Sequence, residues 1–209
     1  MGGFHVLHRL DAATSGCICI PLTYFSQRLA IDAFTKQNVD KYYLALVFGK
    51  INEKDEITID MPIGEDRRFY KYSRCTLKDK NDTKNPNCFN VEKAITKIKV
   101  LQHGTYKDKE CSKILLKPIT GRRHQLRVHL NYLGHPIVGD TIYGLDDYDS
   151  YRTMLHSYKI KLKLDNRKII EAKAPDTFIN EFDPDWKPIN TINQLLIYSL
   201  LFLLSYLSL

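Results

Sequence analysis

An aspartate close to an arginine is the first group in this 209-residue sequence that could carry out chemistry. Asp11 lies in a polar segment, His8–Gly16 (HRLDAATSG), with Arg9 two residues upstream. A neighbouring cation favours the charged form of a carboxylate, which can then act as a nucleophile or stabilise a developing positive charge. The spacing alone is explained more simply by an ordinary turn that Asp11 caps together with the Thr and Ser that follow it. Both interpretations stay open at this level.

A cationic segment further along the chain could bind an anion. Gly121–His129 (GRRHQLRVH) holds three arginines and two histidines, and on a helix His124, Arg127 and Asn131 would share one face. Such a face can bind phosphate, or pair with a carboxylate through two hydrogen bonds. A solvated positive face would have the same pattern. His124 and His129 are five residues apart with no acidic third ligand, so we expect no metal site.

Two aromatic positions are further candidates. Tyr43 and Lys41 share one face of a strand, where the ammonium would favour the phenolate and let the tyrosine act as a base. Simple packing is the plainer role for a strand tyrosine. Asp66–Arg74 (DRRFYKYSR) mixes basic and aromatic residues, which could contact phosphates and stack on single-stranded bases. An exposed hairpin fits that segment equally well.

Charge and cysteine content narrow the class of protein. The 31 Lys and Arg against 24 Asp and Glu give a net charge of +7, and the pI of about 9.0 favours an anionic partner, nucleic acid before membrane. A composition of 44% hydrophobic and 26% charged residues excludes a disordered or collagen-like chain. Five cysteines without CxxC spacing predict neither a disulfide framework nor a structural zinc site, and indicate a reducing compartment.

The elements that must position these residues are mixed. Apolar spacing predicts helices over residues 23–38, with Thr23 as N-cap, and 121–133, ended by Gly134. A strand at Val39–Ile51 is apolar on both faces as far as Phe48. Further strands are expected at Cys17–Pro21, Phe89–Leu101, Ser112–Lys117, Met154–Leu164 and Lys168–Ala174. The predicted fold class is α+β, with a mixed, largely antiparallel sheet and flanking helices.

Four motifs in order along the chain resemble those of the RluA-type pseudouridine synthases. His8–Gly16 matches HRLDxxTSG, and Lys41–Ala45 matches KxYxA. Leu116–His129 matches the long motif LxPxTGRxHQxRxH, which Gly134–Asp140 and Tyr143–Gly144 continue. The resemblance covers residues 5–178 and implies the pseudouridine synthase catalytic fold.

This resemblance implies an isomerase that converts uridine to pseudouridine within RNA, without cofactor or metal. Asp11 would be the essential catalyst, which assists cleavage of the N1–C1′ bond before the uracil rotates and rejoins through C5. Tyr43 would pack on the base and is a candidate for removing the C5 proton, and Arg127 would pair with the aspartate. Arg9 would help to hold the nucleotide flipped out, since the reacting atoms are unreachable in a stacked helix. The expected RNA contacts are Arg9, Arg122, Arg123, His124, Arg67, Arg68 and Lys71.

The resemblance leaves the chemical step and the target open. Asp11 could attack C1′ or C6, or abstract a sugar proton, and the RNA could be ribosomal, transfer or messenger. We expect a monomer with RNA as its partner, in the cytoplasm, with mitochondrion and nucleus as alternatives. The competing hypothesis is a catalytically inactive RNA-binding protein on the same fold. The presence of Asp11, Tyr43 and Arg127 favours the enzyme.

The two ends depart from the family pattern. Only seven residues precede His8, where family members carry further strands, so we expect residues 1–188 to form a catalytic domain without them. Residues 189–209 form an uncharged, hydrophobic tail, whose apolar core is shorter than the roughly 20 residues of a membrane span. It could be a short anchor, a docking helix or the read-through end of a gene model. Membrane association is therefore not the expectation, although the tail leaves it open.

Overall fold

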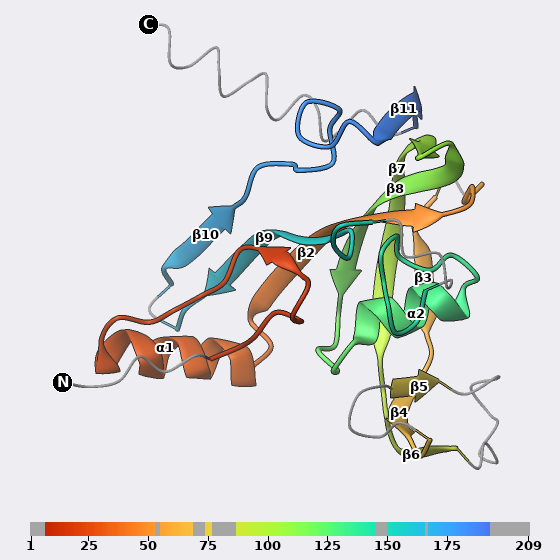
Figure 1. The fold of residues 1–209 in the computed structure, drawn as a ribbon. Coiled ribbons are helices and arrows are strands. Elements are labelled where there is room, and N and C mark those ends of the chain that lie inside the picture. Colours follow the sequence, from red (N-terminus) through yellow and green to blue (C-terminus); the bar gives the residue numbers. More distant parts are fainter. Residues whose placement is uncertain are drawn as a thin grey trace, which may run out of the picture.

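A large, mostly antiparallel sheet forms the body of the protein (Figure 1). The computed structural model describes residues 7–52, 55–68, 74–76, 87–144, 150–165 and 167–192. The sheet has the order β1-β9-β2-β8-β7-β11, with β10 also paired to β9 and β3 also paired to β7. These strands are β1 (Ser15–Gly16), β2 (Val39–Phe48), β3 (Ile57–Asp60), β7 (Ile95–Tyr106), β8 (Lys109–Pro118), β9 (Leu155–Lys163), β10 (Ile169–Lys173) and β11 (Trp186–Thr191). The pair β1–β9 is parallel and the other named pairs are antiparallel, so the predicted α+β class is confirmed.

Helix α1 (Tyr24–Thr35) begins where the sequence predicts. Thr23 Oγ1 accepts a hydrogen bond from the Ser26 amide at 3.1 Å, and Ser26 Oγ accepts one from the Thr23 amide at 3.0 Å. This reciprocal capping satisfies amides that a helix start otherwise leaves unpaired. Buried Ala30 and Ala33 belong to one hydrophobic cluster with apolar side chains of β9.

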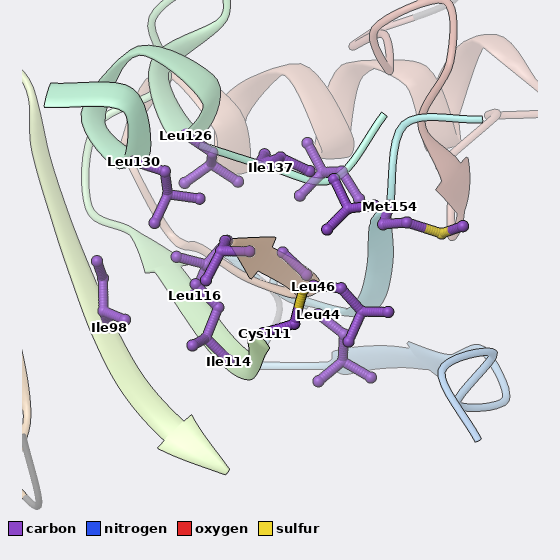
Figure 2. Close-up of a cluster of buried hydrophobic side chains, with 14 of the residues drawn as sticks. Leu44, Leu46, Ile98, Cys111, Ile114, Leu116, Leu126, Leu130, Ile137 and Met154 are labelled. Atoms are coloured by element: carbon purple, nitrogen blue, oxygen red, sulfur yellow. The ribbon is translucent and has the colours of Figure 1, made fainter. Parts of the chain in front are cut away.

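Helix α2 (Gln125–Tyr132) lies on the other part of the sheet, across β7 and β8 (Figure 1). Its residues from Gln125 to Leu130 are all buried. Leu126 and Leu130 belong to the main core with Leu116 of β8 and Ile98 of β7 (Figure 2). Each such side chain contributes about 1.5–3 kcal/mol when it is fully buried. This packing fixes the helix, and every side chain at its start, on the sheet.

The helix is shorter than the predicted 121–133 because His124 has a φ of 55°. That left-handed conformation interrupts the helical path. Residues 121–124 therefore form a turn in front of α2 instead of its first turn.

One predicted strand is wrong and another is divided in two. Cys17–Pro21 is not a strand, because β1 ends at Gly16. The predicted strand Phe89–Leu101 is divided: β6 (Cys88–Glu92) joins a second sheet with β4 (Ile63–Asp66) and β5 (Arg74–Thr76), and β7 begins at Ile95. The two residues between them carry the chain from one sheet to the other.

Strand β11 also crosses the expected domain boundary at residue 188. It pairs with β7 as far as Thr191, and Ile192 packs against the core. Most of the apolar tail, residues 193–209, lies outside the described residues. Among the residues that are described, no helix is long and apolar enough to cross a membrane.

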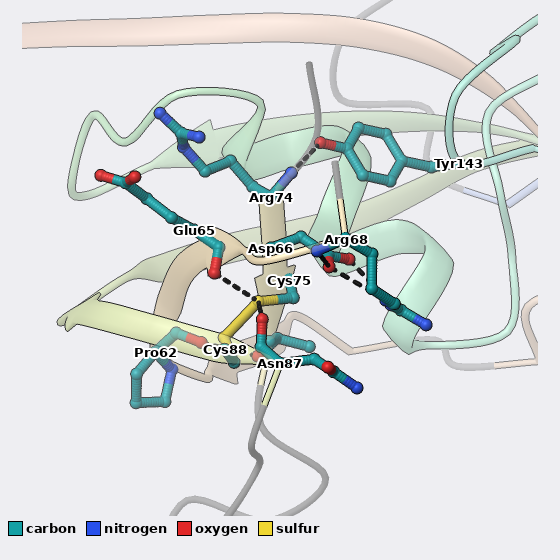
Figure 3. Close-up of a disulfide and its surroundings, with 10 residues drawn as sticks. Pro62, Glu65, Asp66, Arg68, Arg74, Cys75, Asn87, Cys88 and Tyr143 are labelled. Carbon is teal, nitrogen blue, oxygen red and sulfur yellow. Dashed lines mark hydrogen bonds and ion pairs between the residues drawn. A yellow bond between two sulfur atoms is a disulfide. The ribbon is translucent and has the colours of Figure 1, made fainter. Parts of the chain in front are cut away.

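The small sheet contains a disulfide that the sequence reasoning did not expect. Cys75 of β5 and Cys88 of β6 are bonded across β4, with their Cα atoms 5.8 Å apart (Figure 3). The bridge passes over Gly64, where a Cβ atom would lie 2.9 Å from the Cys88 sulfur. The expectation failed because these cysteines are 13 residues apart in no recognisable spacing, and only the pairing of both strands with β4 brings them together.

Candidate active site

The segment His8–Gly16 is a loop that presents Asp11 and is fastened to the protein on both sides. On one side, His8 Nε2 accepts a hydrogen bond from the Cys19 amide at 2.8 Å, and its ring stacks on Phe34 at 5.1 Å between centroids. Burial and the charge of Lys41 lower the pKa of His8, which keeps the ring neutral and able to accept that bond.

The other side of the loop is fastened to β9 through Ser15 and Gly16. Ser15 Oγ lies 2.8 Å from His156 Nδ1, and it accepts a hydrogen bond from Arg152 Nη1 at 2.6 Å. Gly16 has a φ of 106°, and a Cβ atom there would lie 2.2 Å from the Ser157 carbonyl oxygen. Only glycine fits this approach, which explains the Ser-Gly pair of the motif in physical terms.

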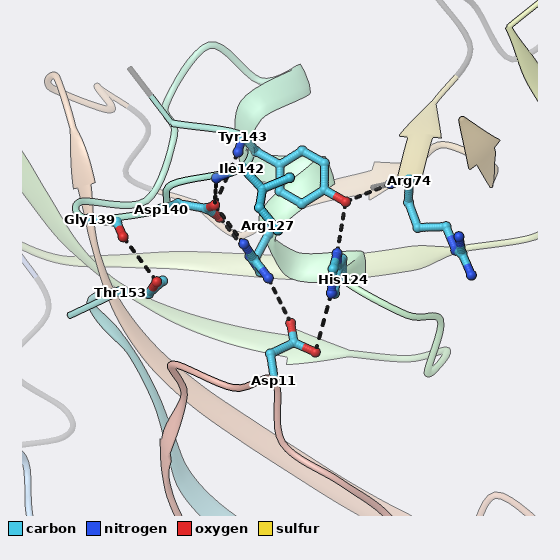
Figure 4. Close-up of polar contacts among 9 residues, drawn as sticks. All are labelled: Asp11, Arg74, His124, Arg127, Gly139, Asp140, Ile142, Tyr143 and Thr153. Carbon is cyan, nitrogen blue, oxygen red and sulfur yellow. Dashed lines mark hydrogen bonds and ion pairs between the residues drawn. The ribbon is translucent and has the colours of Figure 1, made fainter. Parts of the chain in front are cut away.

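Arg127 lies behind Asp11 and is held by a second carboxylate that the sequence reasoning missed. Its Nε and Nη2 donate hydrogen bonds to Asp140 Oδ2 and Oδ1, both at 2.7 Å (Figure 4). Its remaining nitrogen, Nη1, lies 3.5 Å from Asp11 Oδ2. Two parallel hydrogen bonds fix the plane of a guanidinium. Asp140 therefore positions Arg127, and Arg127 in turn faces Asp11.

Both carboxylate oxygens of Asp140 accept hydrogen bonds inside the protein. Its side chain is 1% exposed, and Oδ1 also accepts hydrogen bonds from the Ile142 and Tyr143 amides at 3.0 and 3.1 Å. Burial by itself raises the pKa of Asp140, but the bonds and charge of Arg127 and these two amides outweigh it and hold the pKa below the ordinary value. Asp140 remains an anion at neutral pH.

A second group, His124, approaches the other oxygen of Asp11. His124 Nε2 lies 3.8 Å from Asp11 Oδ1, and its Nδ1 lies 2.9 Å from the Tyr143 hydroxyl. That hydroxyl accepts a hydrogen bond from the Arg74 amide at 2.6 Å, so its own proton is left to point at His124 Nδ1. The neutral tautomer consistent with this network carries its proton on Nε2, toward Asp11.

The His124 ring and the Tyr143 hydroxyl both stay uncharged near neutral pH. Burial, with Arg127 and Arg123 nearby, lowers the pKa of His124 to about 4 against the opposing effect of Asp11. Burial raises the pKa of Tyr143 to about 12. Asp11 is thus flanked by the cationic Arg127 and by a neutral N–H donor.

The side chains of Asp11 and Tyr43 line a cavity of about 580 Å³. Leu10, Leu126 and Leu155 supply part of its apolar wall, and Arg9, Lys41, Arg122 and Arg123 supply positive charge. Burial raises the pKa of Tyr43, and Asp11 adds to this against a hydrogen bond from Ser157. The net effect of the surroundings on Tyr43 is therefore opposite to the one expected from Lys41, because loss of water and the aspartate charge disfavour the phenolate.

The predicted RNA-binding residues divide into two groups. Arg9, Arg122, Arg123 and His124 all line the cavity. Arg122 is already paired, with Nη1 at 2.6 Å from Glu92 and Nε donating to the Lys93 carbonyl.

Arg67 and Arg68 are not among the residues that line the cavity. Arg67 is stacked over Phe89 of the small sheet, and Arg68 donates three hydrogen bonds to Asp66, two from its side chain and one from its backbone amide. Lys71 lies outside the described residues. Asn131, which the helical pattern placed beside His124 and Arg127, is exposed to solvent.

Gln125 is a further residue that the sequence reasoning did not single out. Its Oε1 accepts hydrogen bonds from Thr120 Oγ1 at 2.7 Å and from the Arg122 amide at 3.0 Å. Its Nε2 donates to the Ile95 carbonyl and to Thr96 Oγ1. The buried amide thereby fixes the turn before α2, which carries Arg123 and His124. Its place within the long motif was the one signal that could have found it.

Known proteins match this chain over most of its length. The sequence profile of the RNA pseudouridylate synthases matches residues 2–132. The chain belongs to this family. RNA pseudouridylate synthase domain-containing protein 1 of Danio rerio is 39% identical over 195 residues, which are 92% of this chain and 64% of that relative. tRNA pseudouridine synthase C of Haemophilus ducreyi is 38% identical over 66% of this chain and 54% of its own length.

A solved structure of this family has the same fold. Human RNA pseudouridylate synthase domain containing 1 superposes with a TM-score of 0.85 at 35% identity, over 95% of this chain and 80% of that one. The chain spans 61 to 64% of the length of four vertebrate relatives that it matches. The pseudouridine synthase catalytic fold that the motifs implied is confirmed.

Proposed function

We propose that this chain isomerises uridine to pseudouridine in RNA, with Asp11 as its catalytic carboxylate. The observation that carries the proposal is the placement of Asp11: its carboxylate lines the cavity, 23% exposed, with Arg127 3.5 Å from one oxygen. The family and the fold support RNA pseudouridylation in general. Asp11 is also the one acidic side chain among the described residues that line this cavity, beside several basic ones.

In this reaction the N1–C1′ bond of the target uridine breaks and a C5–C1′ bond forms. The C5 proton leaves and N1 gains a proton, so the product is an isomer and no cofactor is consumed. Asp11 would supply the negative charge that the sugar needs when the base departs. Arg127, held by Asp140, and His124, held by Tyr143, would keep both carboxylate oxygens in place during that step. Fixed dipoles of this kind need no reorganisation as charge develops.

Tyr43 is better suited to packing than to proton transfer. Its ring lines the cavity, and its raised pKa disfavours the phenolate that a base would require. We therefore assign it to holding the uracil ring against the cavity wall while the base rotates. The target nucleotide must be flipped out of its stack to enter, and exposed Arg9 at the cavity is placed to support the flipped strand.

The test is a map of pseudouridine in total RNA from cells with and without this gene, with rescue by wild type or by Asp11→Asn. We expect certain sites to disappear in the knockout and to return with wild type only. The variant should bind RNA nearly as wild type does, because it keeps the shape of the cavity and the surrounding cations.

Asp108→Asn is the matched control for this exchange. Asp108 is 89% exposed in the turn between β7 and β8, and its φ of 62° is one that asparagine tolerates well. Asp108→Asn should restore every site. Full rescue by Asp11→Asn would refute the catalytic role, and an unchanged map in the knockout would favour an RNA-binding protein without activity.

A further inference from the structure

Lys41 is a partly buried cation that the residues around it do not neutralise. It lies on β2, two residues before Tyr43, and its side chain lines the same cavity. Among the residues that the structure describes, Lys41 has no hydrogen-bond or ion-pair partner. Burial accordingly lowers the pKa of Lys41. A lysine removed from water without a partner is costly, and proteins rarely keep one without use.

The contrast with Lys113 shows how this fold treats a structural lysine. Lys113 is 4% exposed, and its ammonium lies 2.5 Å from Asp176 Oδ2 and donates to the Phe178 carbonyl at 2.8 Å. Lys117, one strand away from Lys41, lies 2.9 Å from Asp40. Both structural lysines are satisfied within the protein, and Lys41 is not.

The surroundings of Lys41 contain no available anion within the described residues. Asp40 precedes it on β2, but its carboxylate is already shared by Lys117 and Lys163. His8 is close enough for the ammonium to lower its pKa, and its Nε2 is occupied by the Cys19 amide. The Lys41 ammonium lies against the turn before α2, where a Cβ atom on Gly121 would be 3.2 Å from Nζ.

The cavity as a whole has an excess of positive charge. Of the basic side chains that line it, Arg122 is paired with Glu92, whereas Arg9 and Lys41 have no partner among the described residues. The one carboxylate in the lining, Asp11, already has Arg127 beside it. The charge missing from this cavity is therefore negative, and it must come with the ligand. An RNA strand brings one phosphate with every nucleotide.

We propose that Lys41 binds a phosphate group adjoining the target uridine, in the cavity where Asp11 acts. The inference rests on the proposed function for the identity of the ligand. Lys41 and Tyr43 line the same cavity, and the Lys41 ammonium lies against the turn at Gly121, so a uridine held by Tyr43 would bring a neighbouring phosphate within reach of that ammonium. A phosphate there would supply the missing anion, and the limited water would strengthen the pair. Lys41 would thereby select a nucleotide within a strand over a free base.

The experiment compares Lys41→Met, which keeps the length without the charge, with Lys41→Arg and with the charge control Lys50→Met. Lys50 is exposed at the end of β2 and does not line the cavity. Turnover is measured on a short synthetic RNA carrying a mapped target uridine, and on versions with one uncharged methylphosphonate on the 5′ or the 3′ side of that uridine. Urea denaturation of each free protein accompanies the kinetics.

On the unmodified RNA, Lys41→Met should raise KM by about tenfold or more, the usual effect of losing one charged hydrogen bond. Lys41→Arg should retain most of the binding, and Lys50→Met should behave as wild type. One of the two methylphosphonates should raise the KM of wild type by a similar factor, and the same methylphosphonate should leave the KM of Lys41→Met unchanged. Lys41→Met should be at least as stable as wild type, because it removes an unpaired charge.

The proposal would be overturned if the 5′ and the 3′ methylphosphonate raised KM by equal factors, in wild type and in Lys41→Met alike. It would also be overturned if Lys41→Met had a lower free energy of unfolding but unchanged kinetics. If wild type converts no uridine, the proposed function fails, and the salt dependence of binding to mixed-sequence single-stranded RNA still tests Lys41. Loss of one phosphate contact should lower the slope of log affinity against log salt by about 0.7 in Lys41→Met relative to Lys50→Met. Equal slopes would refute the contact.

Discussion

Asp140→Asn tests whether the aspartate behind Arg127 positions the site. The substitution keeps the shape of the side chain, and its oxygen can still accept from the Ile142 and Tyr143 amides. It removes the charge and one acceptor facing Arg127, which is 9% exposed. Breaking a buried ion pair on one side typically costs about 3–5 kcal/mol, because the other charge stays buried. Asp11 remains 3.5 Å from Arg127, so we expect a loss near the lower end, about 3 kcal/mol.

The double variant Arg127→Met, Asp140→Asn separates stability from activity. Methionine removes the charge that Asp140→Asn leaves unpaired, so the double variant should be more stable than Asp140→Asn alone by about 1–2 kcal/mol. Turnover should stay low in Asp140→Asn, in Arg127→Met alone and in the double variant, because each of them leaves Asp11 without a fixed guanidinium.

The assay is urea denaturation followed by circular dichroism, together with single-turnover pseudouridine formation. Because the folded-state pKa of Asp140 is lowered, its contribution is fully present above the unfolded value of about 3.9 and is lost as pH falls below it. The difference in the free energy of unfolding between wild type and Asp140→Asn should therefore become smaller in acid. The reasoning would be refuted if the double variant lost as much free energy of unfolding as the two single variants together. It would also be refuted if Asp140→Asn kept the stability and the rate of wild type.

Two further predictions concern the loop and His124. Gly16→Ala should destabilise the protein by more than about 2 kcal/mol, from backbone strain and overlap with Ser157. Gly134 has a φ of 83° and no neighbour within 4 Å, so Gly134→Ala should cost only the backbone strain of about 1–2 kcal/mol. If urea denaturation gave equal losses of stability for Gly16→Ala and Gly134→Ala, the predicted overlap with Ser157 would be contradicted. His124 has a folded pKa of about 4, below its unfolded value of about 6.5, so its contribution is complete above pH 6.5 and declines toward pH 4. His124→Gln should flatten the pH dependence of the free energy of unfolding in that window, and an unchanged profile would show that His124 is not held neutral.

The parts of the fold that could be predicted from the sequence are those decided by local pattern. Thr23 caps α1 as its residue type indicates, and β2 is buried on both faces where its sequence is continuously apolar, Leu44–Val47. The strand expected at Cys17–Pro21 failed, because that segment has strand composition but the ladder with β9 contains only Ser15 and Gly16, after which Cys17 adds a single amide bond to Ser157. Local propensity does not show which neighbouring strand is within reach.

In the candidate site, too, the residues within local motifs could be predicted, and the contacts made only in the folded chain could not. Asp11, Tyr43 and Arg127 were found because each lies in a motif, and the structure brings all three to one place. The tight hold of Asp140 on Arg127 depends on two segments that approach only in the folded chain. Sequence distance gave no reason to favour Asp140 over Asp11 as the main partner of Arg127.

The relation between these two carboxylates bears directly on function. A single arginine binds Asp140 through two short hydrogen bonds and faces Asp11 at 3.5 Å through its third nitrogen. If both bonds were made to Asp11, that carboxylate would be held as firmly as a structural ion pair and would have little freedom to reach a sugar or a base. Because Asp140 takes the two strong bonds, Asp11 keeps a fixed positive neighbour without being enclosed by it. Under the proposed function this arrangement leaves the more exposed aspartate free to react, and it predicts that moving the strong pair from Asp140 to Asp11 would lower turnover even where the protein stays folded.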